Sequence, residues 1–490
     1  MFRTCLKSFF IIIFTFITLI TLSNYITLYK NHIDIKAKLA LIYESVVLTK
    51  SQSFKLIDKF YYLKNKNNSI EKVFLDIEKS SLQKSKLDFK SENFNKKKKY
   101  YNSNISFDNG NNFQDADFRL RGNNEWHHQL SKPSIRVKLK KKEPHHMMRH
   151  INFTSPEGRT MIENYYSDLV SKQIGLMSHF SKMVELYINK QSYGLYHMHS
   201  REDESMVRLN KRMPAPLLVG KALDEKWKIN DFEIENINSI SENQNIFSKF
   251  LNEIYIEKRD SNDWKNFWKV VNREQTAKFI AINTILGILH NDYKHNQEFF
   301  YDRTIGKVEP IISDALSLGT FVYPRGKNRL NANNFFFKEK PYYKTPINQK
   351  TNPLLNTILK DISFYHQKNL LIKTLIEKNL SYENQKENLK KIYNEIDNIV
   401  YKDKFKTYIS AKAGIGWQGS EYSNYEYEIF KKNIFYFVNN RIKFLKDELN
   451  KNYIDIEIDK KNNLLIVRYK GELPLTIRSN VFEAKKFNYT

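Results

Sequence analysis

The sequence predicts an α+β fold that is preceded by one transmembrane helix at the amino terminus. Strand-like alternation of apolar and polar residues is concentrated before residue 312, whereas helical periodicity dominates residues 354–449. Because strands and helices do not alternate regularly along the chain, this pattern favours an α+β fold over an α/β fold. With 490 residues, 41% of them hydrophobic, the chain can bury a large core.

Residues 1–29 are expected to anchor the chain in a lipid bilayer as an uncleaved, single-pass signal anchor. Arg3 and Lys7 precede an apolar run from Phe9 to Leu28, and roughly 20 apolar residues are enough to span a bilayer. No Ala-x-Ala-like cleavage site follows this run. Lysines flank both sides, so the positive-inside rule leaves the orientation nearly balanced. A short amino-terminal tail usually stays inside, which would place the bulk of the chain outside the cytoplasm.

The remaining elements follow from local pattern. Residues 30–70 are expected to form a polar juxtamembrane stalk, and residues 203–262 are polar and irregular. The predicted strands are 73–77, 104–107, 118–120, 134–139, 184–189, 193–198, 299–301 and 308–312. The predicted helices are 161–174, 274–289 and most of 354–449.

The carboxy-terminal half divides into three parts by the same criteria. Residues 320–352 form a long aromatic and basic loop, of a kind that is often functional. Residues 353–449 are predicted to be a helical part. Residues 450–490 are predicted to be a small β-unit, because alternation returns over 453–478.

The net charge of +26 comes from 80 Lys and Arg against 54 Asp and Glu. Such a charge fits a polyanionic partner, but Gly (14) and Pro (11) are scarce while Lys, Asn, Ile, Tyr and Phe are abundant. A background composition bias is therefore favoured, and since no nucleic-acid-binding motif occurs, no specific nucleic-acid partner is expected. The single cysteine, Cys5, precedes the apolar run, so the rest of the chain has no disulfide and no thiolate metal site.

One constellation contains the groups that phosphoryl transfer requires, namely an acid near the nucleophile and oxygen ligands for magnesium. Asp292 is followed four residues later by Asn296, and Asp314 follows the apolar strand at 308–312. An ordinary surface turn capped by Asp and Asn would show the same spacing. The pattern alone therefore leaves both interpretations open.

A second constellation could bind nucleotide phosphates. Lys132 begins a strand segment that also contains Arg136, and the backbone near Gly122 can approach a phosphate closely. The alternative is a basic exposed strand in a lysine-rich chain. A zinc site is a further alternative, because His197 and His199 point to one face of a strand, but neither a His-Glu-x-x-His motif nor a cysteine partner occurs.

Taken together and in order, these segments resemble the spore-coat-protein-H (CotH) kinase-like family, whose members are atypical, secretory-type kinases with an α+β kinase-like fold. The resemblance covers roughly residues 100–320. The segments that carry it are 119–126, 132–138, the hairpin at 186–196, 292–296 and Asp314. It implies a kinase-fold domain over residues 71–352.

The resemblance also implies roles for individual residues. Lys132, with Arg136 nearby, would bind the phosphates of ATP, and Gly122 and Asn123 would lie in the turn near the nucleotide. Asp292 would be the catalytic acid. Asn296 and Asp314 would bind Mg²⁺.

The chain departs from the family in one place. After the hairpin the family usually carries a glutamate that is taken to orient the lysine, whereas this chain reads His197, Met198, His199, Ser200, Arg201, Glu202. The glutamate is either displaced to Glu202 or missing. The resemblance thus implies a membrane-anchored phosphotransferase acting on a hydroxyl of a protein or cell-envelope glycan. The alternative is a catalytically degenerate relative that serves as an envelope binding or assembly factor.

Overall fold

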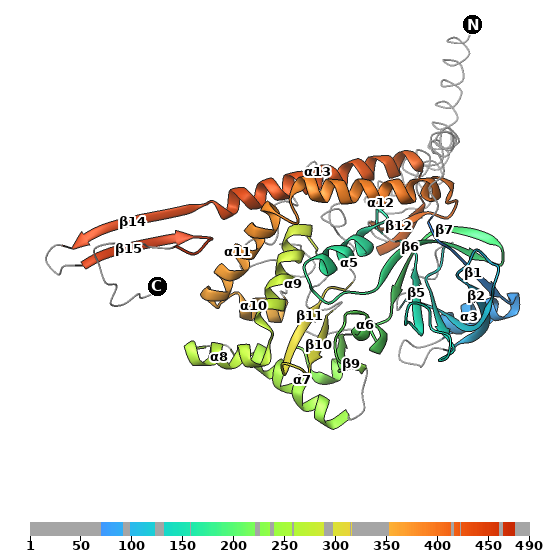
Figure 1. The fold of residues 1–490 in the computed structure, drawn as a ribbon, viewed down its shortest axis with the longest axis horizontal. Helices are drawn as coiled ribbons and strands as arrows, with labels where there is room; N and C mark the ends of the chain where they lie inside the picture. Colours follow the sequence, from blue (N-terminus) through green and yellow to red (C-terminus); the bar gives the residue numbers. More distant parts are fainter. Residues whose placement is uncertain are drawn as a thin grey trace, which may run out of the picture.

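A computed structural model describes residues 70–91, 99–122, 132–156, 158–220, 226–235, 240–256, 259–288, 297–313, 315, 352–412, 416–421, 423–459 and 464–475. A barrel lies at one end of the molecule and a two-stranded hairpin at the other, with helices and a four-stranded sheet between them (Figure 1). The expected anchor and nearly all of the stalk lie outside the described residues. Within those described, no helix has both the length and the apolar character to cross a membrane.

Seven strands close the barrel in the order β1-β2-β3-β4-β5-β7-β6. They are β1 (Lys72–Ile77), β2 (Tyr101–Ser106), β3 (Gln114–Leu120), β4 (Ile135–Leu139), β5 (His150–Thr154), β6 (Ser181–Ile188) and β7 (Gln191–Ser200), with α3 (Lys79–Ser91) between β1 and β2. Alternate residues point inwards, so that Phe118, Val137 and Phe153 meet in an apolar core. The polar residues between them therefore face outwards.

The α+β class is confirmed, but the barrel differs from the kinase-like architecture that the resemblance implied. The closing contact is a parallel pairing between β1 and β6, which sets Val73 beside Leu186. This pairing joins segments more than 100 residues apart. Local alternation predicts six of the seven barrel strands, all except β5, but contains no information about such a partner.

The second sheet is antiparallel, in the order β11-β10-β8-β9. Its strands are β8 (Leu217–Gly220), β9 (Phe232–Glu235), β10 (Glu298–Asp302) and β11 (Lys307–Ile311). The helices nearby in the chain are α6 (Glu204–Leu209), η1 (Ile229–Asp231), α7 (Ile240–Ile254) and α8 (Ser261–Val270). The expectation of an irregular segment at 203–262 was therefore wrong.

Two physical reasons explain this error. Strands β8 and β9 are four residues long, too short for alternation to be distinctive. The apolar face of α7 has helical spacing, with Phe247, Phe250, Leu251 and Ile254 all buried, but polar residues separate them.

The helical part confirms the prediction of helices over 354–449. It consists of α10 (Pro353–Ile358), α11 (Ile362–Glu377), α12 (Tyr382–Lys402) and α13 (Asn424–Leu449), interrupted by the hairpin β12 (Thr407–Lys412) and β13 (Gly416–Glu421). With α5 (Glu163–Gln173), these helices surround α9 (Arg273–Leu286), which is buried along most of its length and ends at Gly287 (φ +63°). The last hairpin, β14 (Asn452–Asp459) and β15 (Leu464–Gly471), confirms the predicted terminal strands.

A buried ion pair joins the helical part to the barrel. Asp403, just beyond α12, accepts a hydrogen bond from Lys132 Nζ and another from the backbone N–H of Leu195 on β7, at 3.2 Å. The Lys132 side chain is 1% exposed and its Nζ lies 5.0 Å from the centre of the Tyr196 ring. Gly194 makes room for this carboxylate, because a Cβ there would lie 2.1 Å from Asp403 Cγ.

Substitution of Gly194 by alanine is expected to destabilise the fold more than the same change at Gly110. Both glycines have positive φ, +76° and +84°, so each alanine is expected to cost about 1–2 kcal/mol of backbone strain. At Gly110 a Cβ meets only the Phe74 ring at 3.4 Å, whereas at Gly194 it overlaps Asp403. Chemical unfolding of both variants measures the difference, and equal losses would contradict the role given to Gly194.

Candidate functional site

The outer face of the barrel carries a row of polar side chains opposite the helical part. The strand register sets Arg119 beside Arg136, Arg136 beside Asn152, and Asn152 beside His199. These residues alternate with the apolar residues of the barrel core and therefore point outwards. Arg136, Asn152 and His199 are nevertheless less than 9% exposed, so the row is covered.

Arg136 is the central cation of this face. Its Nε donates to Asn152 Oδ1 at 2.6 Å, and its Nη2 lies 3.6 Å from Glu202 Oε2. Burial, together with the charges of Arg119, Arg121 and Arg201, lowers the pKa of Arg136 to about 9 although Glu202 opposes this. A buried guanidinium with three cationic neighbours and one carboxylate partner makes an environment that favours an additional anion.

Two glutamates of this region, the buried Glu298 and the half-buried Glu202, have pKa values that differ strongly. Burial opposes the ionisation of Glu202, but the charges of Arg136, His179 and Arg121 prevail and lower its pKa to about 2. Burial and the charge of Glu202 raise the pKa of Glu298 to about 7. Glu298 Oε2 is buried and has no hydrogen-bond partner among the described residues. One carboxylate is thus fixed as an anion while the other can gain or lose a proton near neutral pH.

Three buried histidines lie beside these acids. The His197 and His199 rings stack at 4.7 Å, as expected for two residues on one strand face. His199 Nε2 is 2.9 Å from Thr154 Oγ1, which accepts from Arg121 Nη1 at 3.3 Å. At the other end, Ser181 Oγ is within hydrogen-bonding distance of His197 and donates to Asp168 Oδ2 at 2.6 Å.

The histidines differ in protonation. Burial lowers the pKa of His197 to about 3 and holds that of His199 well below 6.5, so both are neutral at pH 7. For His179 burial is outweighed by the charges of Asp168, Glu202 and Glu298, which raise its pKa. No group of three His, Cys, Asp or Glu side chains in the described ranges converges to bind a metal ion, which leaves the zinc alternative without support there.

The predicted residues Asp292, Asn296, Asp314 and Asn123 lie outside the described residues. The described residues next to Asn296 and Asp314 in the chain are Gln297 and Ser313. Glu298 at the start of β10 pairs in register with Ile311 at the end of β11, so these two strand ends lie side by side at one end of the sheet. Arg121 and Glu202 lie close enough to Glu298 to influence its ionisation. This end of the sheet therefore adjoins the outer barrel face that carries Arg119, Arg121 and Arg136, called the arginine face below.

The predicted phosphate-binding residues separate into two places. Gly122, with φ +118°, follows Arg121 at the end of β3, and Arg136 lies in the arginine face. Lys132 instead belongs to the joint with Asp403. The glutamate that the sequence left open, Glu202, is paired with Arg136 and not with Lys132.

Sequence reasoning missed Glu298, His179 and Asp168. The signal for Glu298 was its position two residues after Asn296, at the start of a predicted strand. His179 and Asp168 carried no comparable signal, because a lone histidine or aspartate near a helix has many ordinary roles.

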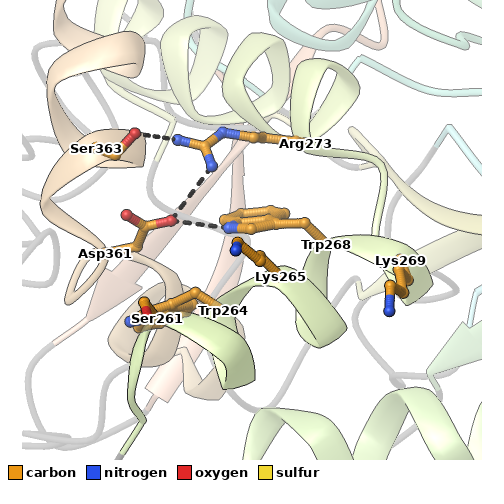
Figure 2. A pocket seen from close by; sticks show the side chains of 8 residues that line it. All are labelled: Ser261, Trp264, Lys265, Trp268, Lys269, Arg273, Asp361 and Ser363. Atoms are coloured by element: carbon orange, nitrogen blue, oxygen red, sulfur yellow. Dashed lines mark hydrogen bonds and ion pairs between the residues drawn. The ribbon is translucent and has the colours of Figure 1, made fainter.

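A separate depression of about 440 Å³ lies between α8, the start of α9 and α11, and contains none of the predicted residues (Figure 2). Four of the residues that line it are joined by hydrogen bonds and an ion pair. Trp268 Nε1 donates to Asp361 Oδ2 at 2.8 Å, and Arg273 Nη2 donates to Ser363 Oγ at 2.8 Å. The Arg273 guanidinium also lies over the Trp268 ring, 5.1 Å from its centre. This arrangement serves the packing of the helices.

Replacement of Lys132 by methionine is expected to cost about 3–5 kcal/mol of stability, because it leaves Asp403 buried and unpaired. Adding Asp403→Asn is expected to restore part of the loss, since asparagine carries no charge and its one side-chain oxygen can still accept from either Leu195 or Phe405, which bond to different carboxylate oxygens of Asp403. Chemical unfolding of both variants tests this. A double variant no more stable than the single one would contradict the assignment.

The neutral histidines make stability depend on pH. His199 has a folded-state pKa well below 6.5, so its contribution is fully present above pH 6.5 and is lost as pH falls below it, when the unfolded chain gains a proton. Between pH 7 and pH 5 the loss is about 2 kcal/mol. In His199→Gln the unfolding free energy should fall by that much less over this range. A His199→Gln variant with the wild-type dependence of stability on pH would contradict this account.

Comparison with known families gives an independent result. The family model described as CotH kinase protein matches residues 118–445, about two thirds of the chain. The match includes β3, the arginine face, β10, β11 and the helices up to α13. No curated protein matches the chain. Because the family model spans well over half of it, the chain belongs to the CotH kinase family.

Proposed function

We propose that this protein transfers the γ-phosphoryl group of a nucleotide to a hydroxyl group of a protein or a cell-envelope glycan, with Mg²⁺ as cofactor. The observation that carries the proposal is the ion pair between Arg136 and Glu202 in an arginine-rich face, next to the end of the sheet where β10 begins and β11 ends. A strand cation held by a carboxylate beside candidate metal ligands is the arrangement that kinases use. Membership of the family supports the same reading.

In this proposal Arg136 and Arg121 bind the nucleotide phosphates. Arg136 is a better candidate than Lys132, because Lys132 is already neutralised by Asp403 in a fully buried joint. Guanidinium groups also match two phosphate oxygens at once, which an ammonium group does not. Glu202 and Asn152 hold the Arg136 side chain in position.

The acids supply the remaining groups. Asp292 accepts the proton of the acceptor hydroxyl as its oxygen bonds to the γ-phosphorus, while the bond from that phosphorus to the β–γ bridging oxygen breaks and the nucleoside diphosphate leaves. Asn296 and Asp314 would bind Mg²⁺, which neutralises phosphate charge when bound. The donor set fits a hard cation, since Glu298 offers a further buried oxygen that has no partner within the described residues.

The membrane anchor belongs to the same proposal. A single-pass helix at residues 1–29 would hold the enzyme at the bilayer, close to envelope acceptors. A topology reporter fused to the carboxy terminus tests which side the enzyme occupies. Extracytoplasmic placement would require a supply of nucleotide outside the cytoplasm.

Nucleotide binding separates the roles of the two candidate cations. We expect Arg136→Ala to weaken binding of ATP–Mg²⁺ by roughly 10- to 100-fold, the value of a charge-assisted hydrogen bond. The matched control is the double variant Lys132→Met with Asp403→Asn, which should bind as the wild type does. Calorimetry of the full chain in detergent measures both affinities.

Further outcomes decide between enzyme and binding protein. Transfer of labelled γ-phosphate that disappears in Asp292→Ala, with binding retained, supports catalysis. Binding without turnover under any acceptor would instead support the degenerate relative that acts as a binding or assembly factor. If the wild-type chain binds no nucleotide, the proposal fails.

A further inference from the structure

Tyr100, just before β2, is a half-buried aromatic residue at the border of the arginine face. β2 pairs with β3 so that Tyr101 meets Phe118 on the side of the barrel core. Because side chains alternate along an extended chain, Tyr100 lies on the outer side, beside Arg119. Its contacts agree with this position, since Arg119 Cζ and Lys138 Nζ each lie 5.5 Å from the centre of the Tyr100 ring.

Tyr100 shares the cationic surroundings of the candidate phosphate-binding residues. Arg119, which contacts its ring, is the register partner of Arg136. Tyr100 also lies close enough to Arg201 to influence the ionisation of that guanidinium, and Arg201 in turn acts on Arg136. Neighbouring strands are about 4.8 Å apart, so the backbone positions of Tyr100 and Arg136 lie roughly 10 Å apart across β3.

The row from Tyr100 to Arg136 is open at one end and covered at the other. Arg136 is 7% exposed, whereas Tyr100, Arg119 and Lys138 are half-buried. Arg119 Nη1 donates to the backbone oxygen of Leu120 at 3.1 Å. Lys138 has no hydrogen-bond or ion-pair partner among the described residues, so its ammonium group is available to a ligand. The accessible end of the row thus offers an aromatic ring and a cation.

We propose that Tyr100 is the platform on which the base of the nucleotide stacks, while the phosphates extend along the row to Arg136 and Arg121. The proposal rests on the proposed function, because it names where the rest of the nucleotide lies in the same site. Every nucleobase has a flat π-face that an aromatic side chain binds by stacking. In a nucleoside triphosphate a ribose and two phosphates separate the base from the terminal phosphate, which suits the separation of Tyr100 and Arg136.

Arg119 and Lys138 add to the binding of the base in two ways. A cation beside the stacked rings contributes cation–π attraction. Guanidinium and ammonium groups also donate hydrogen bonds to the ring nitrogens and carbonyl oxygens of a base. The flexible stem of lysine lets Lys138 move aside for the base while the strand that carries it stays in place. A purely structural role explains Tyr100 less well, because its ring is not part of the apolar core of the barrel.

Two ligands separate binding of the base from binding of the phosphates. ATP–Mg²⁺ carries both, whereas inorganic triphosphate with Mg²⁺ carries the phosphates alone. We expect Tyr100→Ala to weaken binding of ATP–Mg²⁺ by about 10- to 100-fold, the value of one stacked base, and to leave binding of triphosphate unchanged. Calorimetry of the full-length chain in detergent measures both affinities.

Two further variants complete the test. Tyr100→Phe keeps the aromatic ring and should bind ATP–Mg²⁺ as the wild type does. Tyr436→Ala removes a tyrosine of α13 that is 51% exposed and should change neither affinity. If Tyr100→Ala binds ATP–Mg²⁺ as the wild type does, or loses both ligands equally, or if Tyr100→Phe is as weak as Tyr100→Ala, the stacking role is overturned while the proposed function stands. A wild-type chain that binds neither ligand overturns the proposed function itself.

Discussion

The buried pair between Lys132 and Asp403 is the contact on which the relation between barrel and helices depends. It joins residues 271 positions apart, and both side chains are almost fully buried. Burial lowers the pKa of Lys132, opposed by the charge of Asp403, so Lys132 depends on Asp403 to remain ionised. The same carboxylate accepts from the backbone of β7 and rests against Gly194. The Asp403 carboxylate therefore holds β7, the segment of Lys132 and the end of α12 together.

This joint uses the charge of Lys132, so Arg136 is the cation of this region that belongs to the candidate site. Lys132 precedes β4 and faces Asp403, whereas Arg136 lies within β4 and points outwards between core residues Ile135 and Val137. The register with β5 and β7 then places Asn152 and His199 in the same row. Lys132, just before β4, thus stabilises the fold, whereas Arg136 at the centre of β4 belongs to the candidate site.

Local pattern predicted most of the strands and helices, together with the position of Arg136 in a strand. It could not predict partners that are distant in sequence. The alternation at 73–77 identifies a strand but not its parallel contact with β6, and nothing near Lys132 indicates Asp403. Likewise Glu202 was found as a displaced glutamate, but its pairing with Arg136 follows only from the folded arrangement of β4 and β7. Tertiary contacts, not local propensities, determined what was missed.

The two glutamates show how this face is suited to an anion. Glu202 is held ionised by Arg136, His179 and Arg121, and its charge in turn helps to keep Glu298 partly protonated near pH 7. If a bound cation displaces the Glu298 proton into solvent, the negative charge that this adds would be offset by that cation. Cation and phosphate would then favour each other's binding. The opposed pKa shifts of Glu202 and Glu298 thus show that charges on the arginine face and charges at the adjacent end of the sheet influence each other.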